Sequence, residues 1–258
     1  FGEDGLRPLR AVRFAAVLDF ALARATERAL AGALPTFAKV AWERKRDEME
    51  RLLGGATKLR PALRTLLASG MLSELAPELG AEPGVARPLE RLGLGRPWLR
   101  LTAWGLLSGL EPTEIMTLFD RWRIGTAARD AAVAQAKAVL ALGKARPTGA
   151  RLRAWASEAG VEHAEIAALL AQALKGSAFR KFPQQVKSML ETRVPLSIRD
   201  LRVSGSDLLN LGVTGKAVGH TLRGLLAAVL NDPSANERNT LLTLAHTLST
   251  THRVKNSN

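Results

Sequence analysis

The sequence contains no cysteine and no tyrosine, and aromatic residues make up only 5% of its 258 positions. Without cysteine the chain can form neither a disulfide framework nor a Cys-type zinc site, which fits a reducing cytoplasm. So few aromatic side chains argue against the stacking platform that single-strand-binding proteins use. No apolar run approaches the length of a membrane span. We therefore expect a cytoplasmic protein that recognises its partners through charge and shape, without a membrane.

The common catalytic motifs are also missing. The sequence has no G-x-S-x-G elbow, no P-loop and no dinucleotide fingerprint. None of the histidines stands four residues from another or beside an aspartate, and no Asp-x-Asp pair occurs in the chain; the histidines are His163, His220, His246 and His252. The sequence thus predicts no catalytic residue and no metal ligand within this chain.

Positive charge is in clear excess, with 37 Lys and Arg against 24 Asp and Glu, a net charge of +13 and a sequence pI of about 11.1. Such an excess indicates a polyanionic partner, most commonly nucleic acid. An anionic membrane surface is the alternative, but no Lys/Arg cluster adjoins a hydrophobic anchor. Most of the cations are arginines, whose planar fork suits phosphates. With few aromatics available for stacking, the partner expected is a folded RNA.

Apolar residues recur at helical spacing throughout, and strand signals are scarce, so the sequence predicts an all-α fold. Helices are expected over residues 6–19, 26–33, 41–53, 58–69, 98–108, 113–122, 126–142, 151–158, 162–174, 184–193 and 237–248, with a frayed polar end over 250–258. Pro35 is expected to break the chain between helices. Three helical segments in an elongated array follow from this pattern: a neck over 1–55, a body over 56–178 and a tail over 179–258.

The start of the chain concentrates charge at the head of its first helix. One stripe of this helix is expected to face the core, formed by Leu6, Leu9, Val12, Ala16 and Phe20. Arg7 and Arg10 share a second stripe with Phe14. Glu3 and Asp4 precede the helix, where its dipole favours negative charge. The plainest interpretation is a capped amphipathic helix with solvated arginines.

A sharper interpretation is that Asp4 and Arg7 recognise a nucleobase. A carboxylate only accepts hydrogen bonds and a guanidinium only donates them. Side by side they match an edge with an amine next to a ring-nitrogen acceptor, as in cytosine and adenine. Uracil and guanine present the reverse pattern. A good bidentate pair discriminates between bases by about 1–3 kcal/mol.

The sequence EDxxR followed by LRAVRFAA resembles the nucleotide-selecting motif of class II tRNA nucleotidyltransferases, the CCA-adding enzymes. The resemblance implies that Asp4 and Arg7 pair with the base of an incoming CTP or ATP. It also implies that Glu3 holds the arginine, and we add Arg10, on the same stripe as Arg7, to the candidate nucleotide-binding residues. The resemblance extends over most of the chain but is specific only in its first fifty-odd positions.

A second resemblance lies in the segment over residues 43–53. It is similar to the ERxxxEMxxLL segment that braces the base-reading helix in these enzymes. The matching polar positions are Glu43, Arg44 and Glu48, which we expect to brace the first helix.

The third and loosest resemblance is the run over residues 202–230, which contains a Gly-rich turn between two helices. Gly-rich backbone at a helix N-terminus binds anions readily. A tight helix–helix turn is the alternative for any single glycine. Because the tail of CCA-adding enzymes holds tRNA at a similar place, the resemblance favours phosphate contact by Gly212, Gly215, Lys216 and Gly219. Ser206 or Asp207 is expected to cap the helix that precedes this turn.

CCA-adding enzymes begin with a head that carries an Asp-x-Asp pair for two metal ions, and that pair is missing here. The resemblance therefore implies a C-terminal piece whose Mg²⁺ is bound by the missing head, and which selects and binds without catalysing on its own. The expected partners are tRNA, ATP and CTP. An enzyme that adds only CC or only A, a bacterial poly(A) polymerase and a non-catalytic helical RNA-binding module remain open. The sequence does not indicate an oligomeric state.

Overall fold

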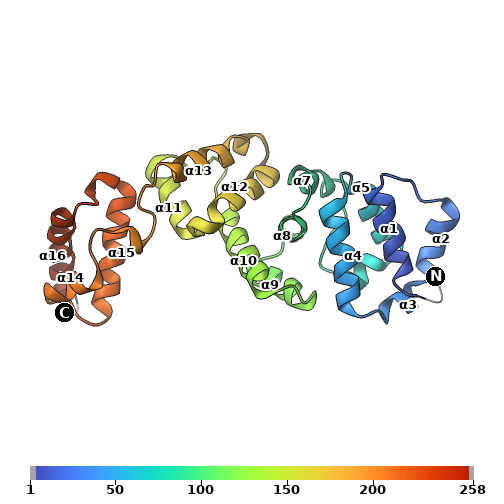
Figure 1. The fold of residues 1–258 in the computed structure, drawn as a ribbon, viewed down its shortest axis with the longest axis horizontal. Helices are drawn as coiled ribbons and strands as arrows, with labels where there is room; N and C mark the ends of the chain where they lie inside the picture. The colour runs from blue at the N-terminus through green and yellow to red at the C-terminus, as the bar shows by residue number, and fades with distance from the viewer. Residues whose placement is uncertain (1–3, 256–258) are drawn as a thin grey trace.

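Helices follow one another along a single direction, so the molecule is elongated and its two ends lie far apart (Figure 1). The structure is a computed structural model, and it describes residues 4–255. Within that range every regular element is a helix. The predicted all-α class and elongated arrangement are confirmed.

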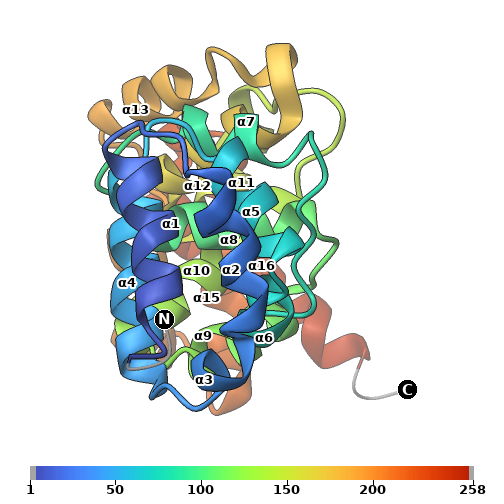
Figure 2. The same cartoon turned by 90° about the vertical axis from the view of Figure 1, so that its right-hand side faces the viewer.

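The N-terminal end consists of short helices packed around α1 and α4. Their bounds are α1 (Arg7–Val17), α2 (Arg24–Gly32), α3 (Leu34–Ala38), α4 (Trp42–Gly55), α5 (Arg60–Ala68) and α6 (Met71–Leu75). Seen from this end, α1 and α4 run side by side (Figure 2). Pro8 stands in the first turn of α1, where no backbone donor is needed. The break between helices expected at Pro35 is confirmed, because α2 ends at Gly32 and Pro35 occupies the same kind of first-turn position in α3.

The middle of the molecule contains the longest buried helices. They are α7 (Ala86–Arg91), α8 (Pro97–Leu107), α9 (Pro112–Arg121), α10 (Thr126–Leu140), α11 (Gly149–Ala159), α12 (Val161–Lys175), the 3₁₀ turn η1 (Gly176–Phe179) and α13 (Phe182–Glu191). Arg100 of α8 is almost wholly buried and donates to the carbonyls of Leu53 and Ala56 at 2.7 and 2.8 Å. It thereby satisfies the C-terminal end of α4 and fixes α4 against α8.

The C-terminal end is a smaller group of helices. It comprises η2 (Ile198–Asp200), α14 (Gly205–Asn210), α15 (Lys216–Asn231), η3 (Pro233–Ala235) and α16 (Arg238–Lys255). Ser204 is the N-cap of α14, and the side chain of Asp207 completes a capping box. The cap therefore begins two residues earlier than the sequence suggested. The polar end expected from residue 250 is also wrong, since α16 continues to Lys255.

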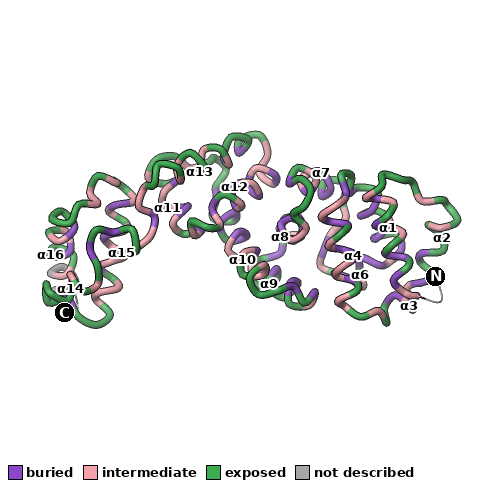
Figure 3. The backbone as a smooth tube through the Cα atoms, viewed as in Figure 1, coloured by how far each residue is buried: buried purple, intermediate pink, exposed green. Residues whose placement is uncertain are grey.

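Two separate hydrophobic clusters hold the described chain together (Figure 3). The larger one runs from Leu6 to Leu196 and the smaller one from Leu201 to Ala245. Arg153 of α11 joins the two regions, because its guanidinium donates to the carbonyls of Leu230 and Asn231 at 2.7 and 2.8 Å. The last helical turn of α15 is thus capped by a side chain from the middle of the molecule.

The predicted core stripe of the first helix is correct up to its last member. Leu6, Leu9, Val12 and Ala16 are buried, but Phe20 is 68% exposed. The helix ends at Val17, and Asp19 adopts a left-handed conformation with a φ of 55°. That turn breaks the helical periodicity before Phe20 and directs its side chain away from the core.

Candidate functional site

Asp4 lies directly before α1 and is fixed from two sides. Its Oδ1 accepts a hydrogen bond from the backbone N–H of Leu6 at 3.1 Å. Arg44 of α4 places Nη2 at 3.3 and 3.2 Å from the two carboxylate oxygens. These interactions lower the pKa of Asp4, the Leu6 N–H contributing most, followed by the charges of Arg44 and Arg7. The carboxylate is therefore ionised and serves only as an acceptor.

Arg7 and Arg10 lie on the exposed face of α1, together with Phe14. The charge of Arg7 also lowers the pKa of Asp4, as the smallest of the causes. Arg10 lies beside α4, with its Nε 3.7 Å from Glu48 Oε1. Glu3, the remaining predicted nucleotide-binding residue, falls outside the described residues.

Gly5, between Asp4 and α1, lies against the backbone of α3. A Cβ at this position would overlap the carbonyl group of Thr36 and would stand 2.9 Å from a methyl carbon of Val40. A glycine is therefore needed for the chain to pass this close to α3 and still bring Asp4 to the head of α1. Sequence reasoning missed this role, because the spacing EDxxR leaves the position open.

Glu48 of α4 contacts α1 through a residue that was not predicted. The carboxylate is buried, and its Oε2 accepts a hydrogen bond from Arg13 Nε at 2.5 Å. Arg51 approaches the other oxygen at 3.5 Å. The guanidinium of Arg13 also stacks on the ring of Phe14, 3.8 Å from its centroid. The only sequence signal for Arg13 was its spacing of three residues from Arg10.

Glu43 and Arg44, the other predicted bracing residues, contact different parts of the molecule. Arg44 binds Asp4, whereas Glu43 forms an ion pair with Arg123, in the turn between α9 and α10. The pKa of Glu43 is lowered, first by its own backbone N–H and then by the guanidinium of Arg123. Arg44 therefore contacts a predicted base-reading residue, and Glu43 contacts the turn between α9 and α10.

The predicted tRNA-binding residues lie at the start of α15, at the opposite end of the molecule from α1 (Figure 1). Gly212 and Gly215 have positive φ values of 77° and 59°, which shape the turn between α14 and α15. Lys216 is the first residue of α15 and is exposed, whereas Gly219 is one turn further along and partly buried. The structure thus places Gly215 and Lys216 at the N-terminus of α15, whereas Gly212 lies at the end of α14, where its N–H donates to the carbonyl of Leu209 at 2.9 Å.

Known proteins match this chain over nearly all of its length. The CCA-adding enzyme of Geobacillus stearothermophilus is 31% identical over 254 residues, covering 92% of this chain and 58% of that enzyme. The CCA-adding enzyme of Bacillus licheniformis is 30% identical over 257 residues, covering 92% and 59%. A crystal structure of the Bacillus stearothermophilus CCA-adding enzyme in complex with CTP superposes with a TM-score of 0.76 at 27% identity, covering 100% of this chain and 64% of that one.

The chain is similar over nearly all of its length to part of the CCA-adding enzymes. The resemblance inferred from EDxxR and ERxxxEM is thereby confirmed. A family model described as the probable RNA- and SrmB-binding site of polymerase A also matches residues 19–82. The chain spans somewhat less than three-fifths of the curated CCA-adding enzymes that it matches.

The metal ions implied by this family do not fit the residues that the structure describes. Within 4–255, no group of three or more His, Asp or Glu side chains is arranged to hold a metal ion. The carboxylates nearest to α1 are already engaged with cations, Asp4 with Arg44 and Glu48 with Arg13. We therefore derive no metal-dependent step from these residues. Among the same residues, no helix is both long and apolar enough to traverse a bilayer.

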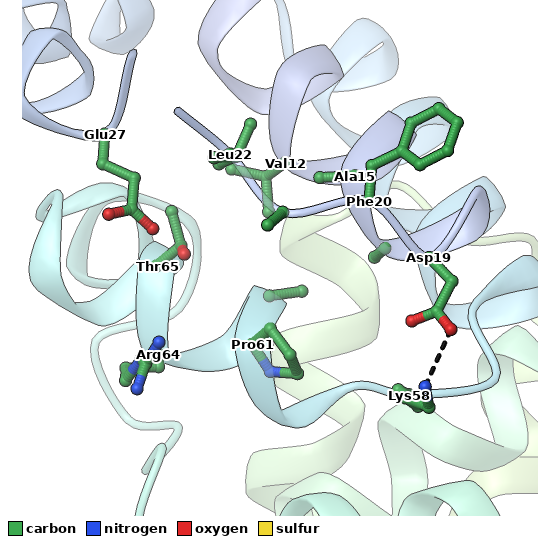
Figure 4. A pocket seen from close by; sticks show the side chains of 13 residues that line it. Val12, Ala15, Asp19, Phe20, Leu22, Glu27, Lys58, Pro61, Arg64 and Thr65 are labelled. Atoms are coloured by element: carbon green, nitrogen blue, oxygen red, sulfur yellow. Dashed lines mark hydrogen bonds and ion pairs between the residues drawn. The ribbon is translucent and has the colours of Figure 1, made fainter. Parts of the chain in front are cut away.

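A cavity of about 400 Å³ lies on the other side of α1, between its C-terminal end, α2 and α5 (Figure 4). Val12, Leu22 and Pro61 form part of its apolar wall, and Asp19 and Lys58 form an ion pair of 2.7 Å at one side. Most of its lining belongs to the segment that matches the RNA-binding family model. Among the residues that the structure describes, none of the predicted site residues lines this cavity.

Proposed function

We propose that this chain is the nucleotide-selecting and tRNA-binding part of a tRNA nucleotidyltransferase that adds CMP and AMP to tRNA 3′ ends. The observation that carries the proposal is an ionised, partly exposed Asp4 beside the exposed Arg7, in a chain similar to part of the CCA-adding enzymes. The reaction itself is assigned to a catalytic head outside these residues, which would bind Mg²⁺.

The hydrogen-bonding capacity of Asp4 supports this role. A carboxylate has about four lone-pair sites. Leu6 and Arg44 use Oδ1, and Arg44 also approaches Oδ2, which leaves Oδ2 able to accept one further donor. The exocyclic amine of cytosine or adenine is such a donor. Arg7 would then donate to the neighbouring ring nitrogen, and a uracil or guanine edge would leave both groups unmatched.

Binding of tRNA is assigned to charge and to the far end of the molecule. The net charge of +13 favours a polyanion, and the turn that Gly212 opens ends in Gly215 and Lys216, which place a glycine backbone and a cation at the N-terminus of α15. We propose that this turn contacts a tRNA phosphate while α1 reads the nucleotide. Affinity for tRNA should then fall steeply with ionic strength, because phosphate contacts release counterions.

The experiment that tests the proposal is Arg7→Ala in the full-length protein. We expect the preference for CTP and ATP over UTP and GTP to fall by about 10- to 100-fold, the range of one bidentate base contact. Affinity for tRNA should stay unchanged, because Arg7 and α15 lie at opposite ends. Unchanged nucleotide preference would contradict base selection. It would favour the second candidate, a non-catalytic RNA-binding module. The observation that supports this candidate is the net positive charge of the chain.

A poly(A) polymerase or an enzyme that adds only CC or only A would share the same reading residues. Incubation of the full-length protein with a tRNA lacking its 3′ end separates these candidates, since the added nucleotides can be sequenced. Addition of C, C and A supports the proposal, whereas a run of A identifies a poly(A) polymerase.

A further inference from the structure

The first turn of α4 directs consecutive charged side chains to different parts of the molecule. Arg44 binds Asp4 at the head of α1, and Lys45 donates to the carbonyl of Ala38 at 3.2 Å. Glu43 pairs with the guanidinium of Arg123, and Arg46 Nη1 donates to the carbonyl of the same residue at 3.1 Å. Adjacent residues of one helical turn thus connect Asp4 to the turn between α9 and α10.

Arg123 has an unfavourable backbone conformation. Its φ is 53°, in the left-handed region that glycine adopts without cost and other residues do not. The backbone bonds of Arg123 to Asp120 at 2.9 Å and of Ile124 to Phe119 at 3.0 Å are those of a helix end that normally favours glycine. A glycine has a positive φ in the comparable turn after α8, at Gly109. Only the ion pair with Glu43 requires the arginine side chain, since the carbonyl that accepts from Arg46 belongs to the backbone. The arginine therefore forms this ion pair at the expense of local strain.

Strain of this kind is kept where surrounding contacts fix it, often because the side chain has a function. The side chains of Arg123 and Glu43 are 62% and 45% exposed, so their ion pair adds little to stability. Its effect is on orientation, because it ties the base of α4 to the α9–α10 turn. When that turn moves, Glu43 moves with it. Arg44 is the next residue of α4 and binds Asp4, so the position of Asp4 changes as well.

We propose that Arg123 is a positioning residue that couples the binding of tRNA to the nucleotide-reading Asp4. This inference rests on the proposed function and adds to it a link between its two substrates. If the α9–α10 turn shifts when RNA binds, the affinity for CTP changes, and thermodynamic linkage requires CTP to change the affinity for RNA by the same factor.

The test measures the dissociation constant for CTP in the full-length protein with and without bound tRNA. We expect the ratio of the two constants to differ from one by several-fold in the unchanged protein and to return to about one in Arg123→Gly. Glycine suits the backbone at this position, so the midpoint of thermal unfolding should stay the same or rise. Glu43→Gln should give the same loss of coupling, and the double variant should lose no more than either single change.

A matched control is Arg129→Gln, because Arg129 pairs with Asp120 and Asp130 within the middle region and not with α4. This substitution also removes one positive charge close to the α9–α10 turn. The ratio of the two dissociation constants for CTP should stay as in the unchanged protein. A ratio of one in the unchanged protein, or an unaltered ratio in Arg123→Gly, would overturn this inference alone. A protein that binds no CTP at all would overturn the proposed function as well.

Discussion

Arg13 and Glu48, 35 residues apart in the sequence, form a buried ion pair that joins α1 to α4. Only 9% of Arg13 and 3% of Glu48 is exposed. A buried pair contributes less than its short distance suggests, because both charges lose their hydration. Its main consequence is geometric, since it fixes the rotation of the helix that carries Arg7 and Arg10.

Removal of the carboxylate should therefore be costly. In Glu48→Ala the guanidinium of Arg13 stays buried without its counter-charge, and the free energy of unfolding should fall by about 3–5 kcal/mol. Urea denaturation measures this change. Glu50→Ala, on the same helix but outside the pair, should cost less than about 0.5 kcal/mol. Equal changes in the free energy of unfolding for the two substitutions would show that the Arg13–Glu48 pair does not stabilise the fold.

Arg153 fixes the C-terminal end of the molecule to its middle. Arg153→Met keeps most of the aliphatic stem but loses both bonds to the last carbonyls of α15, which should cost about 1–3 kcal/mol. Leu230 of α15 packs against the larger hydrophobic cluster beside these bonds, and the rest of α15 belongs to the smaller cluster. We expect the radius of gyration to grow in X-ray scattering while the helical content stays the same. Arg151→Met, an exposed arginine on the same helix, provides the control. A variant with unaltered dimensions would argue that hydrophobic contacts alone fix the two regions.

Acid should weaken the start of α14 through Asp207. The ion pair with Arg238 is the largest cause that lowers the pKa of Asp207 well below its usual value, followed by bonds from Ser204. A carboxyl with a lowered folded-state pKa stabilises the fold fully above the unfolded value of about 4, and this contribution is lost as the pH falls below it.

Thermal unfolding recorded between about pH 6 and pH 2 tests this expectation. The midpoint of thermal unfolding should fall less steeply with decreasing pH in Asp207→Asn than in the unchanged protein, because the variant has no carboxylate at this position to protonate. Glu165→Gln, an exposed carboxylate elsewhere, should decline as steeply as the unchanged protein. If Asp207→Asn declines equally steeply, other carboxylates account for the acid sensitivity.

The sequence predicted local structure well because the spacing of apolar residues reflects which face of a helix is buried. The stripe from Leu6 to Ala16 and the exposed Arg7, Arg10 and Phe14 follow directly from that spacing. Errors arose where a turn ends the periodicity, as at Asp19 before Phe20. The break next to Pro35 was predictable, because proline cannot continue a helix and favours the first turn of the next one.

Contacts between distant segments could not be predicted in the same way. The motif spacing indicated that Glu48 braces α1, but which arginine it binds depends on how α1 is rotated against α4. Glu43 and Arg123 are 80 residues apart, and their contact depends on the packing of the α9–α10 turn against α4. The roles of Asp4 and Arg7 in reading a base stay a prediction, although the structure brings their charges together.

The central claim is that Asp4 accepts a hydrogen bond from the exocyclic amine of the nucleotide. The most direct measurement compares the affinity of the full-length protein for CTP and for the 2-pyrimidinone analogue, which lacks that amine, in the unchanged protein and in Asp4→Ala. We predict that the unchanged protein prefers CTP by about 10-fold or more and that Asp4→Ala binds both equally, since its partner for the amine is gone. An equal preference for CTP in both proteins would contradict the account.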